Sequence, residues 1–408
     1  MTLVSPAVTS EVGQLREVVL HRPGLELRRL TPANKEALLF DELVWVAKAQ
    51  EEHDGFVDLL RRQGVRVRFF AELLADTLGD EGLRLEMIQQ IATADGCGTE
   101  LVQRVRGHLK ELPVDQLVTH LIGGLTVQEV PGAADGFVGG VLGPAAFLLP
   151  PLPNAVFTRD PSAWVGRGVM LSPMHMPARR AERRLWRTIY THHADFAGTG
   201  ERLWYGDQER DYFPATIEGG DVLVLSPRCV AIGLSERSHP VAAENLAARL
   251  FESGAVDYVL AIDLPKSRGT MHLDTVMTVV DRDAIVLWPR AVRLLDAYRI
   301  EPGSGGRMRV TAEPDLMRAV AAGMGTDSLR VVTTGEDEVL ADREQWDDGN
   351  NTLAVRPGVV VAYERNADTN RRLVDAGVQV LQISSHELPR GRGGPRCMSC
   401  PVVRDPLD

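Results

Sequence analysis

Four segments of the sequence repeat one pattern, and this repeat constrains the fold more than any other feature. Each segment begins with Asp or Asn, continues as an apolar strand, turns on Gly, Pro or Asp, and returns as a second apolar strand. The four copies span residues 160–173, 221–237, 274–289 and 351–365. Predicted helices follow the second and fourth copies at 242–253 and 366–376, and short strands come next at 258–262 and 379–383. The repeat therefore predicts units of the form strand-strand-helix-strand.

The spacing between the copies is irregular, which argues against an open solenoid of identical units. A closed array of the units around an axis is the more economical arrangement. In such an array, the Asp and Asn residues that begin the copies would point toward the axis together. We therefore expect an α/β fold whose chemistry lies at that axis.

The chain before the first copy changes character once. Residues 14–23 and 65–69 are predicted strands, and the apolar residues between 34 and 60 recur at helical spacing, which predicts one or two helices. From 71 to about 143, hairpin turns are absent. Three successive amphipathic helices are predicted in this part, at 81–94, 99–109 and 113–122. We interpret residues 71–143 as an all-helical insertion within a β-rich chain.

Composition excludes several classes of protein. The net charge of −11 argues against nucleic-acid binding, which needs a basic surface, and mildly favours a cationic substrate. The sequence has no uninterrupted apolar run of about 18 residues, so no membrane span is expected. It begins without the basic and apolar segments of a signal peptide, and its four cysteines are too scattered for a disulfide framework. We expect a cytoplasmic protein.

The segment 391–401, GRGGPRCMSCP, contains a candidate nucleophile. Its glycines and proline predict a loop around Cys397. Positive charge on the flanking Arg392 and Arg396 would favour the thiolate form, which is the reactive one. Alternatives for Cys397 and Cys400 are a CxxC redox pair, half of a zinc site, or two inert thiols. A zinc site would need a second ligand pair at suitable spacing, and the sequence offers none.

Acidic residues and one histidine recur at matching ends of the repeated units. They lie in the segments FTRD (157–160), IEGGD (217–221) and MHLD (271–274), and comprise Asp160, Glu218, Asp221, His272 and Asp274. Taken singly, an Asp before a strand is usually a cap or turn residue, and a lone His is usually structural. In an extended chain, however, His272 and Asp274 would face the same side of the sheet. Gly219 and Gly220 would let the backbone approach neighbouring chains closely.

Carboxylates gathered around a cysteine raise its pKa and oppose ionisation. Such a site is reasonable if the substrate supplies the missing positive charge. A guanidinium is the natural candidate, because its fork of N–H donors matches carboxylates two at a time. Cys397 would attack the guanidinium carbon, and His272 would first protonate the leaving ammonia and then activate water. This chemistry needs no metal and no organic cofactor.

These segments also resemble the arginine deiminase family. The resemblance rests on FTRD, EGGD, MHLD and RCMSCP (396–401), together with LLFDELVWVAKAQEEHD (38–54) and REQWDDGNNTLAV (343–355), and it extends nearly from end to end. It implies a five-bladed pseudo-symmetric α/β propeller of the pentein superfamily with an inserted all-helical domain. The propeller would comprise 1–70 and 144–408, and the helical insertion 71–143. The implied reaction converts L-arginine to L-citrulline and ammonia.

The resemblance also implies roles for individual residues. Cys397 matches the family's nucleophile, His272 its acid and base, and Glu218 the carboxylate that supports them. Asp160 and Asp274 match the pair that binds the guanidinium. The remaining matches are substrate-binding residues: Asn154, Arg179, Arg237, Asp221 and the loop residue Arg392. Arg180 is adjacent to Arg179 and is an alternative for the same role.

Local differences and alternative functions stay open at this point. Ala155 and Val156 are smaller than expected, and Cys400 offers a partner for an oxidised Cys397. An amidinotransferase, a deiminase of agmatine or of a modified arginine, or a catalytically silent arginine-binding protein would retain much of the same pattern. Arginines for an α-carboxylate favour a free amino acid as substrate, and a retained nucleophile argues against simple binding. We expect a homodimer or homotetramer.

Overall fold

Five sheets of three or more strands share one local pattern among the residues that the structure describes, which are 6–196, 198 and 202–407 of this computed structural model. In each sheet a central strand pairs antiparallel with one neighbour and parallel with another. The antiparallel pair is a tight hairpin in four of the sheets. The parallel strand follows the central strand after a connection that contains a helix, as parallel pairing requires.

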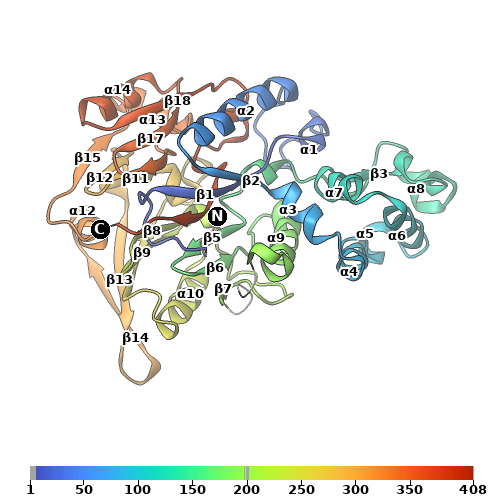
Figure 1. Cartoon of the computed structure of the whole chain (residues 1–408), viewed down its shortest axis with the longest axis horizontal. Helices are drawn as coiled ribbons and strands as arrows, with labels where there is room; N and C mark the ends of the chain where they lie inside the picture. The colour runs from blue at the N-terminus through green and yellow to red at the C-terminus, as the bar shows by residue number, and fades with distance from the viewer. Residues whose placement is uncertain (1–5, 197, 199–201, 408) are drawn as a thin grey trace.

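The five sheets, each with its central strand named second, contain the following strands. They are β19 (Cys400–Arg404), β1 (Leu15–Leu20) and β2 (Arg66–Phe69); β5 (Ser162–Val165), β6 (Gly168–Leu171) and β7 (Leu203–Tyr205); β8 (Val222–Ser226), β9 (Cys229–Leu234) and β10 (Tyr258–Asp263); β11 (Met277–Asp281), β12 (Ala284–Leu287) and β15 (Arg330–Thr333); and β16 (Leu353–Arg356), β17 (Val359–Tyr363) and β18 (Gln379–Ile383). The third sheet continues through β13 (Asp296–Pro302) and β14 (Met308–Glu313), whose hairpin projects from the body in Figure 1.

The four hairpins predicted from the repeat are confirmed as β5–β6, β8–β9, β11–β12 and β16–β17. The fifth unit has the same pattern, but the two ends of the chain build it. Its first strand, β19, comes from the C-terminal part and pairs antiparallel with β1 from the N-terminal part. Local periodicity gives no sign of this pairing, because the two strands lie at opposite ends of the sequence.

Helices connect each central strand to its parallel neighbour. The connecting helices are α1 (Leu25–Arg28) and α2 (Val46–Arg62), α9 (Arg180–His192), α10 (Pro240–Glu252), α12 (Leu316–Met324) with the short α11 (Ala291–Leu294), and α14 (Ala367–Asp375). One further helix, α13 (Glu338–Trp346), leads to β16. The prediction of helix throughout 34–60 is wrong in its first part. Residues 32–39 form turns that end at Leu39, whose φ of 66° is left-handed and incompatible with a continuing α-helix.

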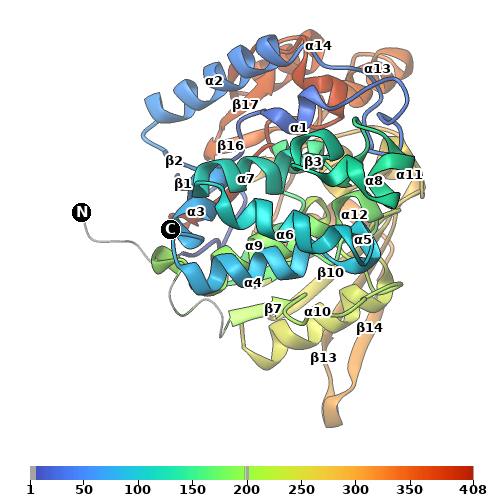
Figure 2. The same cartoon turned by 90° about the vertical axis from the view of Figure 1, so that its right-hand side faces the viewer.

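A run of short helices separates β2 from β5. It comprises α3 (Phe70–Thr77), α4 (Glu81–Ile91), α5 (Ala94–Cys97), α6 (Leu101–Glu111), α7 (Val114–Gly123) and α8 (Phe137–Leu142), and the two-stranded sheet of β3 (Leu125–Thr126) and β4 (Phe147–Leu149) lies beside them. Helices α4 to α8 extend to the right of the sheets in Figure 1 and lie in front of them in Figure 2. Phe70 of α3 stacks on Trp186 of α9 with ring centroids 4.8 Å apart, so the helices share one hydrophobic core with the second sheet.

The central strands form the interior of the molecule. β6, β9, β12 and β17 are buried along their whole length, as expected for strands covered on both faces. Polar side chains are therefore restricted to the ends of these strands and to the turns that lead into them. Among the described residues, no helix is both long and apolar enough to span a membrane.

Candidate active site

The predicted site residues lie in the turns that precede the first strand of four units. Asp160 lies shortly before β5, Glu218 before β8, His272 before β11, and Cys397 before β19. Asn351, which begins the fourth hairpin copy, lies in the equivalent place before β16. Each of the five units thus contributes at the same point of its pattern, and for four of them the repeat predicted this position.

Cys397 is buried, with 3% of its surface exposed. Its backbone N–H donates to Oδ1 of Asn351 at 2.9 Å, and its Sγ lies 3.7 Å from Oδ2 of Asp274. Burial, followed by the charges of Asp274 and Asp160, raises the pKa of the Cys397 thiol well above its ordinary value. In the substrate-free site the sulfur is therefore a protonated thiol.

In this substrate-free structure the charge of Arg396 lowers the pKa of the Cys397 thiol, as expected, but burial and the charges of Asp274 and Asp160 outweigh it. The Arg396 guanidinium is occupied by Oε2 of Glu11 at 3.1 Å and by Oδ2 of Asp274 at 2.6 Å. Arg392 lies over the ring of Trp346, with Cζ 3.5 Å from the ring centroid. Proximity in sequence is a poor guide here, because both guanidiniums interact with other groups than the thiol.

His272 is held by two carboxylates. Its Nε2 is 2.8 Å from Oε2 of Glu218, and its Nδ1 is 3.6 Å from Oδ1 of Asp160. Burial lowers the pKa of His272, but the charge of Asp160 and the hydrogen bond to Glu218 outweigh it and raise the pKa to about 9. Burial also opposes ionisation of Glu218, yet the hydrogen bond from His272 and the charge of Arg237 lower its pKa to about 2. At neutral pH the pair is an imidazolium and a carboxylate.

The close approach of His272 depends on glycine. A Cβ at Gly220 would lie 2.6 Å from Nδ1 of His272, and a Cβ at Gly219 would lie 2.1 Å from the carbonyl oxygen of Arg159. The prediction that these two glycines permit close backbone approach is confirmed. The reason given for pairing His272 with Asp274 is wrong, however, because 273–275 form a 3₁₀ turn and not an extended strand.

Asp160 and Asp274 each have one carboxylate oxygen that accepts a hydrogen bond and one that accepts none. Oδ2 of Asp160 accepts from Nη1 of Arg179 at 2.5 Å, and Oδ2 of Asp274 accepts from Arg396. Oδ1 of both residues is buried and has no hydrogen-bond partner among the described residues. A buried carboxylate oxygen without a donor is costly, so both oxygens are candidates to accept from a cationic ligand.

A small cavity joins these groups. It is lined by Leu39, Asn154, Phe157, Asp160, Arg179, Arg237, Arg268, Met271, His272, Thr275, Gly391, Arg392 and Cys397. Its volume is about 20 Å³, which is room for about one water molecule. Glu218 and Asp274 lie behind it, against His272 and Cys397 respectively. The cavity must widen before it can hold an amino acid.

The other predicted substrate-binding residues differ in availability. Arg237 is buried at the cavity wall, and its Nε has no hydrogen-bond partner among the described residues. Arg179 also lines the cavity, but Glu182 and Asp160 already bind its guanidinium. Asn154 lines the cavity and donates to the carbonyl oxygen of Leu38 at 2.8 Å.

The structure does not bring Asp221 to the cavity wall. Its Oδ2 accepts from the hydroxyls of Ser235 and Ser238, both at 2.6 Å, and its Oδ1 accepts from the backbone N–H of Leu273 at 2.8 Å. Burial raises the pKa of Asp221 to about 7. Asp221 therefore positions the turn that presents His272.

Several neighbours of the site were missed by the sequence analysis. Glu11 holds Arg396, and Asn351 binds the Cys397 backbone and donates to the carbonyl oxygen of Asp274 at 3.2 Å. Asn351 opens a hairpin copy, so its position in the repeat was a usable signal, whereas nothing near Glu11 in the sequence marks it. No cluster of His, Cys, Asp or Glu with the geometry of a metal site occurs in the described part of the chain.

Solved structures with the same fold define the class of the protein. An amidinotransferase from Microseira wollei is 15% identical in sequence, covers 98% of both chains, and superposes with a TM-score of 0.57. A DDAH from Pseudomonas aeruginosa, solved in complex with citrulline, is 14% identical, covers 95% of this chain and 99% of its own, and gives a TM-score of 0.52. At this identity the likeness concerns the fold alone, which is the α/β fold of the pentein superfamily.

Sequence comparison identifies the family within that class. The family model described as arginine deiminase matches residues 36–404. The arginine deiminase of Rhodococcus opacus is 49% identical over 401 residues, which is 98% of this chain and 97% of that protein. The chain belongs to the arginine deiminase family.

Proposed function

We propose that the protein is an arginine deiminase that hydrolyses L-arginine to L-citrulline and ammonia. The observation that supports this most is that Oδ1 of Asp160 and Oδ1 of Asp274 are buried without a hydrogen-bond partner among the described residues, while both carboxylates oppose ionisation of Cys397. A cation is the ligand that such a site lacks. The planar guanidinium of arginine can donate to both carboxylates at once.

Binding of the guanidinium would activate the nucleophile. The positive charge offsets the two carboxylates that keep the Cys397 thiol protonated, so the pKa of the thiol falls and the thiolate forms beside the guanidinium carbon. The enzyme would thereby avoid a reactive thiolate when no substrate is bound. Thiolate formation is coupled to binding of the correct cation.

The reaction would then proceed in two halves. The Cys397 thiolate attacks the guanidinium carbon, and the His272 imidazolium protonates one terminal nitrogen, which leaves as ammonia. An S-alkylthiouronium remains on the cysteine. The neutral His272 next accepts a proton from water as the water attacks the same carbon. Collapse of the adduct breaks the C–S bond and passes the proton of the new hydroxyl to solvent, which releases citrulline and the thiolate. Glu218 orients the imidazole and stabilises its charged form.

The amino-acid end of the substrate would lie toward Arg237. Its buried guanidinium lines the cavity and has, among the described residues, one ion pair, a contact of 3.6 Å between Nε and Oε1 of Glu236, so it can also bind an α-carboxylate. Arg179, which lines the cavity whereas Arg180 does not, would complete the contacts together with Asn154, and Asp221 would act through the His272 turn. Arg392 would move with its loop, since the cavity of about 20 Å³ has no room for arginine.

We further propose that the five strand-strand-helix-strand units are the blades of a five-bladed, pseudo-symmetric α/β propeller. Residues 1–70 and 144–408 would form this propeller, and 71–143 an inserted helical domain. The shared position of the site residues before the first strand of each unit supports this arrangement. The protein would act in the cytoplasm as a homodimer or homotetramer, without a cofactor or metal.

The test is to incubate the purified protein with L-arginine and to measure citrulline and ammonia together. We expect the two products in equal amounts, without any added amine. Parallel assays with agmatine, canavanine and N-methylated arginines would define the preferred substrate. Turnover that requires an amine acceptor would identify an amidinotransferase, and arginine binding without products would identify a silent binding protein.

A further inference from the structure

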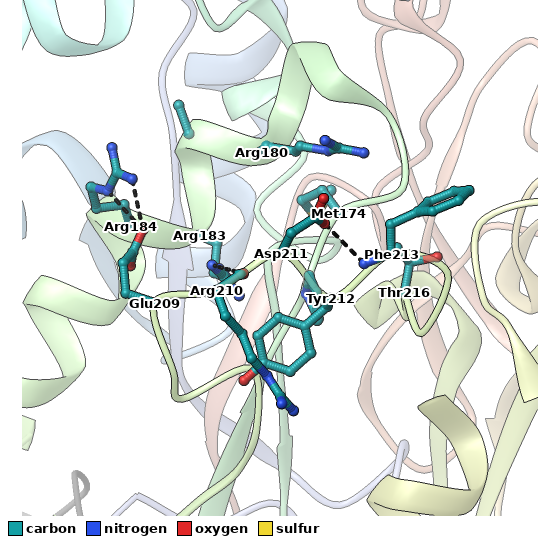
Figure 3. A pocket seen from close by; sticks show the side chains of 12 residues that line it. Met174, Arg180, Arg183, Arg184, Glu209, Arg210, Asp211, Tyr212, Phe213 and Thr216 are labelled. Carbon is teal, nitrogen blue, oxygen red and sulfur yellow. Dashed lines mark hydrogen bonds and ion pairs between the residues drawn. The ribbon is translucent and has the colours of Figure 1, made fainter. Parts of the chain in front are cut away.

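A second and larger cavity lies beside the N-terminal end of α9. Its volume is about 440 Å³, within the range of about 300–1,000 Å³ that is typical of small-molecule sites. It is lined by Pro173, Met174, Arg180, Ala181, Arg183, Arg184, Glu209, Arg210, Asp211, Tyr212, Phe213 and Thr216 (Figure 3). None of its lining residues also lines the cavity that contains Cys397. We call it the α9 cavity.

Arginines dominate the wall of the α9 cavity. Arg184 is paired with Glu209 at 2.6 Å, so its charge is balanced. Arg180, Arg183 and Arg210 also line the cavity, and none of them has an ion pair with a carboxylate among the described residues. These three guanidiniums outnumber Asp211, the carboxylate that lines the cavity besides Glu209, so the wall is locally positive in a chain with a net charge of −11.

Arg183 is the most informative of the three. It is 9% exposed, its Nη2 donates to the carbonyl oxygen of Arg210 at 3.3 Å, and its Nη1 is buried without a hydrogen-bond partner among the described residues. Burial also lowers the pKa of Arg183. A buried guanidinium N–H without an acceptor costs free energy, and an anionic or polar ligand could supply the missing acceptor.

Two of the guanidiniums share one aromatic ring. The Cζ atoms of Arg183 and Arg210 lie 5.0 Å and 4.5 Å from the ring centroid of Tyr212. The Tyr212 ring stabilises each of the two cations, but it carries no net charge and leaves the repulsion between the two guanidiniums unbalanced. Figure 3 shows Arg183 reaching from α9 and Arg210 and Tyr212 from the loop opposite. An anion between the two elements would offset this repulsion.

The end of α9 adds to the positive potential. The helix has 13 residues, begins at Arg180, and has no side-chain cap on its first N–H groups. The 3₁₀ turn Pro177–Arg179 runs directly into this end, and the backbone N–H of Arg180 donates to the carbonyl oxygen of Pro177, so the helix dipole alone favours an anion here. At the rim, Phe213 is 60% exposed and tilted against His175 at 6.1 Å, which leaves an aromatic face available to a planar group.

We infer that the α9 cavity is a binding site for a phosphorylated small molecule, separate from the catalytic cavity. A phosphoryl group has three acceptor oxygens and up to two negative charges, which suits Arg183 and its two unpaired neighbours better than a single carboxylate does. The volume leaves room for the rest of the molecule beside Tyr212 and Phe213. The ligand is either inorganic phosphate or a phosphate ester with a planar ring.

The experiment measures binding of inorganic phosphate and of AMP by isothermal titration calorimetry. The full-length Cys397→Ser protein is used, so that saturating L-arginine can be added without turnover. We expect one anion per chain with a dissociation constant in the micromolar range, unchanged by arginine. AMP binding at least about tenfold tighter than phosphate would identify a phosphate ester as the ligand, and equal affinities would identify phosphate itself.

Two substitutions and one control locate the site. Arg183→Gln and Arg210→Gln should each weaken binding by about tenfold or more, since each removes a charge-assisted donor. Arg210 is exposed, so its variant remains informative if loss of the buried Arg183 impairs folding. Arg62→Gln, an exposed arginine at the end of α2, should leave binding unchanged. Absence of binding, displacement by arginine, or full affinity in both α9-cavity variants would overturn the inference.

Discussion

The two cavities near the start of α9 differ in charge. In the wall of the catalytic cavity and directly behind it, the buried atoms without a hydrogen-bond partner include carboxylate oxygens of Asp160 and Asp274 and guanidinium nitrogens of Arg237 and Arg392, and the cavity is almost closed. In the α9 cavity, the unsatisfied buried atom is the Nη1 of Arg183, and the cavity is open and large. The first cavity thus offers acceptors for a guanidinium and donors for a carboxylate, the two charged groups of arginine, whereas the second offers an unpaired donor alone.

Two residues that are adjacent in the sequence, Arg179 and Arg180, line different cavities. Arg179 faces the catalytic cavity and is neutralised by Asp160 and Glu182, whereas Arg180 faces the α9 cavity and has no ion pair among the described residues. Loss of a group that meets the cation should therefore affect turnover. Loss of a nearby group that is already paired with another residue should leave turnover unchanged.

The largest effect is expected at the nucleophile. Cys397→Ser should reduce turnover by about 10⁴-fold or more, because the hydroxyl is a far weaker nucleophile, while arginine still binds. Cys400→Ser is the matched control. Cys400 lies 3.5 Å from the Ser162 hydroxyl and 3.7 Å from the Tyr190 hydroxyl, so a serine fits its surroundings and activity should remain. Robust citrulline formation by Cys397→Ser would contradict the mechanism.

The next largest effect is expected at the two carboxylates. Asp160→Asn and Asp274→Asn should each lower kcat/KM by about 100-fold or more, since each removes a charge aimed at the substrate cation. The protein should still fold, because Arg179 keeps Glu182 and Arg396 keeps Glu11. Steady-state kinetics and melting temperatures distinguish lost chemistry from lost structure.

Asp54→Asn is the control for the carboxylate variants, since Asp54 pairs with Arg22 at the surface. Such an exposed ion pair contributes about 1 kcal/mol or less. Its kinetics should match those of the unmodified protein. A similar loss of activity in all three Asp variants would mean that the effect is not specific to the cation site.

Substitution of Arg237 should change substrate preference. Arg237→Ala should raise the KM for arginine by about 10- to 100-fold, which corresponds to the loss of a charged hydrogen bond of about 1.5–3 kcal/mol. The KM for agmatine, which lacks the α-carboxylate, should change little. Equal effects on the two substrates would remove Arg237 from the carboxylate-binding role.

The smallest effect is a shift in pH dependence. The pKa of His272 is raised to about 9, so the imidazolium is present below that pH and activity should fall as the pH rises through it. Glu218→Gln removes a group that raises this pKa, so the alkaline limb of kcat/KM should move to lower pH. The expected shift is about 1–2 units, given the energy of a hydrogen bond to a charged group. An unchanged alkaline limb would show that His272 is not the proton donor.

Features that depend on residues close together in the chain could be predicted from the sequence. The four hairpins, and the matching positions of Asp160, Glu218 and His272, follow from alternation and turn residues that lie close together in the chain. The fifth unit was not predicted, because β19 and β1 come from opposite ends. The predicted helix before Val46 fails for a similar reason. Its apolar residues cover the catalytic cavity, where Leu39 lies in the wall.

The protonation state of Cys397 could not be predicted from its neighbours in the sequence. Arg396 is adjacent to Cys397 in sequence, but its charge is used by Glu11 and Asp274, which lie far from it along the chain. The charges of the carboxylates consequently change the pKa of the thiol more than the charge of Arg396 does. The carboxylates predicted around Cys397 did indicate the correct direction of its pKa shift, and with it the need for a cationic substrate.

The central claim is that a bound cation converts Cys397 from thiol to thiolate. The most direct measurement is the pH titration of thiolate ultraviolet absorbance, taken as the difference between the unmodified protein and Cys397→Ser, with and without an unreactive amidinium ligand. We expect a protonated thiol at neutral pH without ligand, and a clearly lower pKa of the Cys397 thiol when the amidinium is bound. A thiolate already present at neutral pH in the free protein, or a pKa that the ligand leaves unchanged, would contradict it.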